Sequence, residues 1–160
     1  MTIVVCLVGT HFRRPFDGIR FWSKRQGITR LYLLYSNAQS EDETAIFSYM
    51  SRRNAESLKE RLEIMDPIMV GYDPMDHRDA FRTLYGIFSQ ARSDGEEVLI
   101  DITSTTNLTQ GVALTITLMF RNARVATKSS RLCRNAIEML VSGRLTCTSP
   151  APGWKGIKTS

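Results

Sequence analysis

Four apolar runs alternate with four stretches of helical periodicity along the chain, at a spacing of roughly 30 residues. The first run, residues 3–8, is rich in β-branched side chains, which is typical of a strand buried on both faces of a parallel sheet. Further strands are predicted at residues 30–35, 67–72 and 97–102, with a short fifth strand at residues 123–127. Because parallel strands require crossover connections and helices supply them here, this order of elements predicts an α/β domain.

The helices between these runs are indicated by their caps and by their apolar stripes. One helix is expected from Pro15 to about Gln26, ended by Gly27, and Ser40 and Asp76 are predicted to cap two later helices. With right-handed crossovers, the fold class is an open, mainly parallel Rossmann-like sheet with helices on both faces. The side chains expected to face the sheet are, helix by helix, Phe16, Ile19 and Trp22; Phe47, Ala55, Leu58, Leu62 and Met65; Phe81, Leu84, Tyr85 and Phe88; and Leu108, Val112, Ile116 and Met119.

Positive charge is concentrated in the last quarter of the chain. Residues 1–120 hold 13 Lys and Arg against 15 Asp and Glu, whereas residues 121–160 hold eight against one. We expect residues 1–128 to form the Rossmann-like domain and residues 129–160 a basic extension, with one helix at residues 130–141 and irregular structure after it. We interpret the extension as a solvated tail, and a nucleic-acid contact is the alternative.

The cysteines and the hydropathy pattern favour a cytoplasmic protein with no membrane partner. Cys6, Cys133 and Cys147 form no close pair, so neither a disulfide framework nor a zinc site is expected. No apolar stretch approaches the ~18–20 residues needed to span a bilayer, and residues 3–8 are too short for a signal sequence. Two distant histidines without an acidic cluster indicate no metal site, and no cofactor is predicted.

Small and polar residues follow the predicted strands, at the edge of a parallel sheet where ligands bind. They are Gly9, Thr10 and His11 after the first strand, Ser36 and Asn37 after the second, and Thr103, Ser104, Thr105, Thr106 and Asn107 after the fourth. The hydroxyls of the last group, with the free N–H groups of a helical first turn, predict a phosphate or nucleotide site. Ordinary N-capping is the alternative, although one cap needs one such residue rather than four.

Known nucleotide and nucleophile motifs are absent from the sequence. It contains no GxGxxG after the first strand, no GxxxxGK[ST] and no GxSxG, so a standard dinucleotide site, a P-loop and a nucleophile elbow are not indicated. His11 and Arg13 follow the first strand and are candidates for a ligand loop, with a plain surface role as the alternative. Asp101, at the end of the fourth strand, is expected to anchor the loop backbone.

Three segments together resemble the CARF domain (CRISPR-associated Rossmann fold). They are VGT at the end of the first strand, LYLLYS in the second, and VLIDITSTTNLTQG over the fourth strand and its loop. The resemblance covers residues 1–127 and extends to the CARF-like sensor domain of archaeal helix-turn-helix regulators. It implies a homodimer that binds a cyclic oligoadenylate across its two-fold axis in CRISPR-linked antiviral defence. Some members of the family cleave that ligand and are called ring nucleases.

Carried over by position, the resemblance places the ligand loops at residues 9–11 and 103–107. Two positions depart from the family pattern. The usual Gly-Gly is Ser104-Thr105 here, so the close approach of backbone to ligand that glycines allow is less favoured there. A lysine common after the turn is Asn107 here, which removes a phosphate partner.

Three functions are compatible with this resemblance. The first is a sensor that binds a cyclic oligoadenylate as a homodimer and has no chemistry of its own. The second is a metal-independent ring nuclease, in which the ligand's 2′-hydroxyl attacks the adjacent phosphate and Thr10, His11, Arg13, Ser104 and Thr105 are the candidate residues. The third is a transcription regulator that contacts DNA through the basic C-terminal region.

The expected dimer assigns two faces to the helix that follows residues 103–107. The apolar stripe from Leu108 to Met119 is expected to pack on the sheet. Gln110, Ala113 and Thr117 are then expected to face the partner, so that both copies contribute residues 103–107 to one shared pocket.

Overall fold

The computed structural model describes residues 1–38, 44–63, 65–127, 139–141 and 145–147. Its main element is a five-stranded parallel sheet with the strand order β3-β2-β1-β4-β5. The strands are β1 (Thr2–Leu7), β2 (Ile28–Ser36), β3 (Ile68–Tyr72), β4 (Glu97–Asp101) and β5 (Ala123–Ala126). The five predicted strands and the open, parallel Rossmann-like sheet are therefore confirmed.

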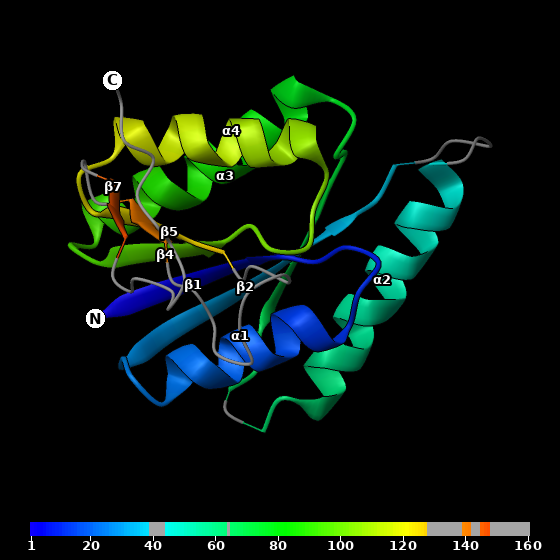
Figure 1. The fold of residues 1–160 in the computed structure, drawn as a ribbon, viewed down its shortest axis with the longest axis horizontal. Coiled ribbons are helices and arrows are strands. Elements are labelled where there is room, and N and C mark those ends of the chain that lie inside the picture. Colours follow the sequence, from blue (N-terminus) through cyan, green and yellow to red (C-terminus); the bar gives the residue numbers. More distant parts are fainter. Residues whose placement is uncertain (39–43, 64, 128–138, 142–144, 148–160) are drawn as a thin grey trace, which may run out of the picture.

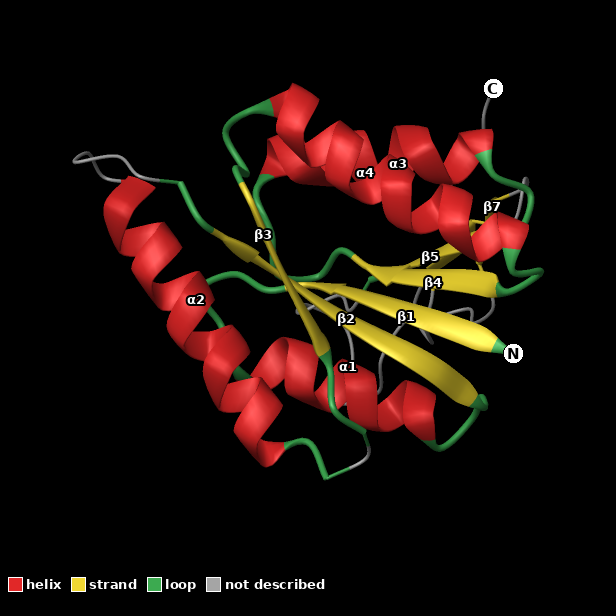
Figure 2. Ribbon diagram, turned by 180° about the vertical axis from the view of Figure 1, so that it is seen from behind, coloured by secondary structure: helices red, strands yellow, loops and turns green. Residues whose placement is uncertain are grey.

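Four helices cover the two faces of the sheet in pairs (Figures 1 and 2). α1 (Arg13–Ser23) and α2 (Thr44–Arg61) lie on one face, and α3 (His77–Ser93) and α4 (Asn107–Met119) lie on the other. No helix within the described ranges has the length and apolar character needed to cross a membrane.

β1 is the central strand, and all six of its residues are buried because helices cover it from both sides. Its side chains alternate between two apolar layers. Val4 and Cys6 pack in the layer under α1 and α2, whereas Ile3, Val5 and Leu7 pack in the layer under α3 and α4. This double burial explains why the first run of the sequence is continuously apolar rather than alternating.

α1 differs from the predicted helix at both ends. It begins at Arg13, two residues before the predicted start at Pro15, and it ends at Ser23. Proline is tolerated anywhere in the first turn, where its missing N–H has no intrahelical acceptor, so Pro15 does not mark the start. Gly27 is not the C-cap, because among the described residues only Gly95, after α3, has a positive φ, 69°.

The buried face of α4 is rotated by about one residue from the predicted face. Leu108 and Met119, expected on the sheet, have 40% and 52% of their surface exposed. The expectation that Ala113 and Thr117 face a partner is also wrong, since both are buried. The buried residues of α4 are Thr109, Ala113, Ile116 and Thr117.

Internal hydrogen bonds let α4 bury threonines in place of leucines. Thr109 Oγ1 donates to the carbonyl of Pro74 (3.4 Å), and Thr117 Oγ1 donates to the carbonyl of Ala113 (2.7 Å). Because α4 carries apolar residues on most of its sides, apolar periodicity does not distinguish the inner face from the outer one. Tyr85 of α3, also expected inside, is 43% exposed.

The C-terminal region contains two strands where a helix and irregular structure were predicted. β6 (Met139–Val141) pairs antiparallel with β7 (Leu145–Cys147). The helix predicted over residues 130–141 is therefore wrong at 139–141, and the irregular structure predicted after it is wrong at 145–147. The rest of both predictions lies outside the described residues. Three consecutive apolar residues suit a strand as well as a helix, so periodicity could not decide between them.

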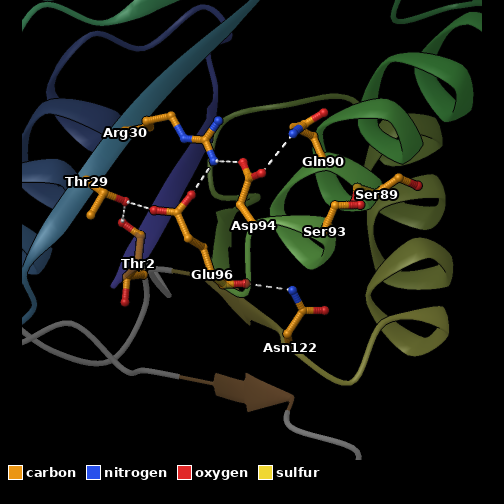
Figure 3. A network of polar contacts seen from close by, with 9 residues as sticks. All are labelled: Thr2, Thr29, Arg30, Ser89, Gln90, Ser93, Asp94, Glu96 and Asn122. Atoms are coloured by element: carbon orange, nitrogen blue, oxygen red, sulfur yellow. Dashed lines mark hydrogen bonds and ion pairs between the residues drawn. The ribbon is translucent and has the colours of Figure 1, made fainter.

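A polar network joins β2 to the end of α3 and the turn before β4 (Figure 3). Arg30 forms ion pairs with Glu96 and, at 2.5 Å, with Asp94. Glu96 also accepts a hydrogen bond from Thr29 Oγ1 (2.6 Å), and its backbone carbonyl accepts one from the Asn122 amide (2.7 Å). These bonds lower the pKa of both carboxyls, with Arg30 as the main cause at Asp94 and Thr29 followed by Arg30 at Glu96. The network therefore fastens the edge of the sheet opposite the polar loops.

Replacing Arg30 by methionine should lower the melting temperature by a few degrees at neutral pH and by less in acid. Carboxyls with a lowered folded-state pKa contribute stability above their unfolded pKa of about 4, and that contribution is lost as the pH falls through the folded-state value. Thermal unfolding followed by circular dichroism at about pH 7 and about pH 3.5 measures both differences. Arg53→Met, at an exposed position of α2, serves as the control. An equal drop in melting temperature at both pH values would show that Arg30 does not act through the charges of Asp94 and Glu96.

Candidate ligand site

The sheet has its topological switch point between β1 and β4. From β1 the chain moves outward through β2 to β3, and it then crosses back to β4 and moves outward to β5 on the other side. The loops after β1 and β4 therefore leave neighbouring strands and lead to helices on opposite faces. In open parallel sheets a ligand binds in the crevice at such a point.

The two loops touch through their backbones at Gly9 and Ser104. A Cβ atom on Gly9 would overlap the carbonyl oxygen of Ser104 and would lie 3.2 Å from its Oγ. Only glycine fits at this position, because any side chain would push the loops apart. The position at which the fold requires a glycine thus lies on the β1 loop, and it allows a close approach between the two loops.

Ser104 carries a buried hydroxyl that has no partner among the described residues. Only 7% of the residue surface is exposed, and its Oγ makes no hydrogen bond there. Leaving a buried hydroxyl unsatisfied costs roughly 1–3 kcal/mol, and a bound water or a ligand group is the usual way in which such a bond is completed. Because the oxygen is closed to solvent here, Ser104 marks the junction of the two loops as a candidate site.

Two other hydroxyls of the β4 loop have structural partners. Thr106 is the N-cap of α4 and accepts a hydrogen bond from the backbone N–H of Thr109 (3.2 Å). The hydroxyls of Thr105 and Tyr72 share a hydrogen bond of 3.1 Å, and burial raises the pKa of Tyr72. Helix capping therefore accounts for one residue of the cluster, and the bond to Tyr72 joins the end of β3 to the site.

Asp101 holds the start of the β4 loop from inside the fold. Its Oδ1 accepts a hydrogen bond from the backbone N–H of Thr103 (2.8 Å). Its other carboxylate oxygen lies against α1, where a Cβ on Gly18 would be 2.6 Å away. Asp101 also pairs in register with Cys6 on β1, and burial together with this nearby carboxylate raises the pKa of the Cys6 thiol. The buried carboxylate thus positions the loop backbone.

Side chains on one side of α2 fasten the ends of β1 and β2. Ser51 Oγ donates to the carbonyl of Val8 (2.5 Å) and accepts a hydrogen bond from the backbone N–H of Ser36 (2.9 Å). Asn54 Nδ2 donates to the carbonyl of Gly9 (2.9 Å). The backbone that contacts Ser104 is therefore supported from α2 by two hydrogen bonds.

Ser36, a candidate ligand residue in the sequence, is used by the fold. It is buried, and its hydroxyl shares a hydrogen bond of 2.6 Å with Ser48. The sequence analysis missed Ser48, Ser51 and Asn54, whose spacing of three places them along one side of a helix. A polar stripe at the border of an apolar helix face is the signal that could have identified them.

The remaining candidates lie at the surface around this junction. Thr10, His11 and Arg13 are exposed after β1, Asn37 is exposed after β2, and Asn107 is exposed at the first residue of α4. The first N–H groups of α4 have no acceptor within the helix and carry its partial positive charge, so they favour an anion. In the part of the chain that the structure describes, no three His, Cys, Asp or Glu side chains gather as a metal-binding group. The groups that this junction offers to a ligand are therefore mainly hydroxyls and backbone N–H groups, together with the Arg13 side chain.

An apolar groove of about 1000 Å³ lies between α3 and α4 and starts at the first turn of α4. Phe81 and Tyr85 of α3 and Leu108 and Val112 of α4 contribute to its walls. Leu118, with 71% of its surface exposed, continues this apolar surface one turn beyond the groove. An exposed apolar surface of this kind marks an interaction site on a protein.

No protein-family model and no curated protein sequence matches the chain. Solved structures do share its fold, among them Can2 and Csm6. Can2 from Sulfobacillus thermosulfidooxidans, in complex with cyclic tetra-adenylate, aligns with a TM-score of 0.57 and 12% identity over 82% of this chain and 33% of its own. Enterococcus italicus Csm6, bound to cyclic hexa-2′-fluoro-hexa-dAMP, aligns with a TM-score of 0.56 and 13% identity over 86% of this chain and 36% of its own.

The chain therefore spans about a third of the length of either protein. At such low identity the likeness concerns the fold, and it agrees with the resemblance found in the three sequence segments. The chain shares the Rossmann-like fold of these two proteins.

Proposed function

We propose that the chain is a sensor that binds a cyclic oligoadenylate at the interface of a homodimer, in CRISPR-linked defence. The observation that carries the proposal is the backbone contact of Gly9 with Ser104 at the switch point, beside the first turn of α4. Two proteins of the same fold are bound to ligands of this class, cyclic tetra-adenylate in Can2 and cyclic hexa-2′-fluoro-hexa-dAMP in Csm6.

The donors at the junction match the phosphates of such a ring. The N-terminal N–H groups of α4 can donate to phosphate oxygens, and the helix dipole favours the negative charge of the phosphate. The contact at Gly9 keeps both loops close enough to reach one phosphate. Asp101 and Asn54 hold the loop backbones through hydrogen bonds, so the site is formed in advance and little ordering is needed on binding.

The outer side of α4 supports the homodimer. A ring with two-fold symmetry is bound best by two copies of one site, related by the same axis. Leu108, Leu114 and Leu118 are exposed on α4, and the helix starts at the ligand loop. Burying this surface in a partner contributes about 25 cal/mol per Å² of apolar area, and the loss of translational and rotational freedom on association opposes this gain. The partner thus meets the leucines of α4 instead of the buried Ala113 and Thr117.

Binding without cleavage is the function that the geometry favours. Of the five catalytic candidates, the three after β1, Thr10, His11 and Arg13, are exposed, and they make no side-chain hydrogen bond within the described residues that would hold them in line with a phosphate. We therefore propose binding without ring cleavage. The basic extension, on which DNA binding would depend, lies mostly outside the described residues, so the DNA-binding regulator stays an untested alternative.

Replacing Thr106 by aspartate should abolish or strongly weaken ring binding while leaving the fold intact. Aspartate caps a helix at least as well as threonine, so α4 keeps its start. The added carboxylate lies beside the phosphates of the bound ring and repels them. Isothermal titration calorimetry with cyclic tetra- and hexa-adenylate should give one ring per two unchanged chains, and at least about tenfold weaker binding for Thr106→Asp.

Thr106→Asn is the matched control, because asparagine has the same shape as aspartate, caps equally well and is neutral. We expect Thr106→Asn to bind the ring within about threefold of the unchanged protein, and both variants to keep their melting temperature. Equal affinities of the two variants would place the phosphates elsewhere. No heat from either ring with folded, unchanged protein would overturn the proposal.

Leu118→Glu should convert the homodimer to a monomer and weaken ring binding. A carboxylate at this position must lose its hydration if the apolar surfaces of two copies meet there. Sedimentation velocity on both proteins measures the change. Ile46→Glu on α2 is the matched control, because Ile46 has the same exposed fraction, 71%, on the opposite face of the sheet. A dimer that survives Leu118→Glu, or an unchanged protein that is monomeric, would exclude this face as the interface.

A further inference from the structure

A second groove lies on the other face of the sheet, which α1 and α2 cover (Figures 1 and 2), between α1 and the C-terminal half of α2. It consists of two hollows of about 380 and 210 Å³ that share Arg61 in their walls. Along α1 it reaches from Phe12 to Lys24, a distance of about 18 Å at 1.5 Å per helical residue. No part of the proposed ring site or dimer face requires this groove.

The walls of the groove are strongly basic. Arg20, Lys24, Arg53 and Arg61 line it, against a single carboxylate, Glu63. None of the four cations forms an ion pair with an acidic side chain in residues 1–38, 44–63 and 65–127. Because their charge is not neutralised there, it is available to an external anion.

Aromatic rings alternate with these cations. The rings of Phe12 and Phe16 stack, with centroids 5.5 Å apart and 22° between planes. The guanidinium of Arg61 lies over Phe12 at 5.2 Å, and that of Arg20 lies over Phe16 at 5.6 Å. Two of the four cations are thus held in place by rings, which reduces the conformational entropy that a bound ligand would cost them.

We propose that the α1–α2 groove binds single-stranded nucleic acid. The charges of Lys24 and Arg53, one in each hollow, meet phosphates of the backbone, while the guanidinium planes of Arg20 and Arg61, held by the rings beneath them, offer stacking surfaces for bases. An acidic peptide would satisfy the charge but would not stack on these planes. Bases of a single strand are free to stack on such planes, whereas the bases of a duplex are paired and stacked on one another, so the surface suits a single strand better than a duplex.

The groove also ends at the proposed ring site. Phe12 follows the β1 loop directly, and Asn54, which lines the smaller hollow, donates to the carbonyl of Gly9. A strand in the groove would therefore lie within one side chain of the loop that contacts Ser104. Its binding does not depend on the ring, so the two proposals stand or fall separately.

The double variant Lys24→Glu/Arg53→Glu tests the proposal on the full chain. Fluorescence anisotropy with a short labelled oligouridylate, measured at several salt concentrations, gives the affinity and its salt dependence. For single strands each phosphate contact contributes a slope of about −0.7 in log affinity against log salt, so losing two contacts should reduce the slope by about 1.4. At about 50 mM salt the affinity should fall at least about tenfold.

The control variant Arg92→Glu/Arg121→Glu changes the net charge equally at exposed residues at the ends of α3 and α4. It should reduce the affinity by less than about threefold and keep the slope. Equal effects of the two double variants would show that the charge of the whole protein or the basic extension binds RNA, and would overturn the proposal. No binding by the unchanged protein would do the same.

Two further arms separate the alternatives. Polyglutamate that displaces the oligouridylate as well as unlabelled RNA does would identify an acidic-peptide surface instead, and tighter binding of an RNA duplex would exclude a single-strand groove. Calorimetry with cyclic tetra-adenylate should be unchanged by Lys24→Glu/Arg53→Glu. Lys24→Glu/Arg53→Glu should lose oligouridylate binding and keep ring binding, whereas Thr106→Asp should lose ring binding and keep oligouridylate binding. The two variants thus distinguish failure of one site from failure of the other.

Discussion

The backbone contact between Gly9 and Ser104 is the constraint on which the rest of the site depends. It joins two loops that lead to helices on opposite faces of the sheet, and it exists only because residue 9 has no side chain. Both sides of the contact are supported from the face of the sheet that α1 and α2 cover. Asn54 on α2 holds the carbonyl of Gly9, and Asp101, whose carboxylate also lies against α1, holds the N–H of Thr103 next to Ser104.

This double support gives the site its rigidity. The bonds of Ser51, Asn54 and Asp101 are made inside the protein, where each contributes about 1 kcal/mol and costs more if one partner is lost. The hydroxyl of Ser104, between these supports, is left without a partner among the described residues. A rigid frame around one unsatisfied donor is the arrangement expected where an external group completes the bonding.

The arrangement also separates three surfaces by their chemistry. The junction of the β1 and β4 loops is polar, the outer side of α4 is apolar, and the α1–α2 groove is basic. Since the sheet lies between α4 and the α1–α2 groove, a dimer formed through α4 leaves the groove open. One small domain can thus associate with a copy of itself and still contact another molecule.

The sequence predicted the layout of the strands and of the loops, because both follow from local patterns. Residues 3–8 are apolar without interruption since helices cover β1 on both faces, and the small residues Gly9 and Thr103 to Asn107 mark the strand ends. The side of α4 that faces the sheet was predicted wrongly, because two threonines are buried on that side. Their hydroxyls are satisfied by carbonyls, Pro74 for Thr109 and Ala113 for Thr117.

The partners of the supporting side chains could not be predicted for the same reason. Ser48, Ser51 and Asn54 form a polar stripe in the helical pattern, but what they bond is known only once the ends of β1 and β2 are placed beside them. Likewise, the sequence predicts a polar Ser36 at a strand end but not its hydrogen bond to Ser48 on α2. These hydrogen bonds join residues far apart in the chain, whereas hydrophobic periodicity gives information only about residues close together in the sequence.

The most direct test of the account is to map the ligand on the backbone. Two-dimensional ¹H–¹⁵N spectra recorded while cyclic tetra- or hexa-adenylate is added report on each N–H group separately. The account predicts the largest shifts at Gly9, Thr10, Ser104 and the first turn of α4, with little change in α1 and at the Arg30 network. Shifts confined to other parts of the sheet, with Gly9 and Ser104 unaffected, would contradict it.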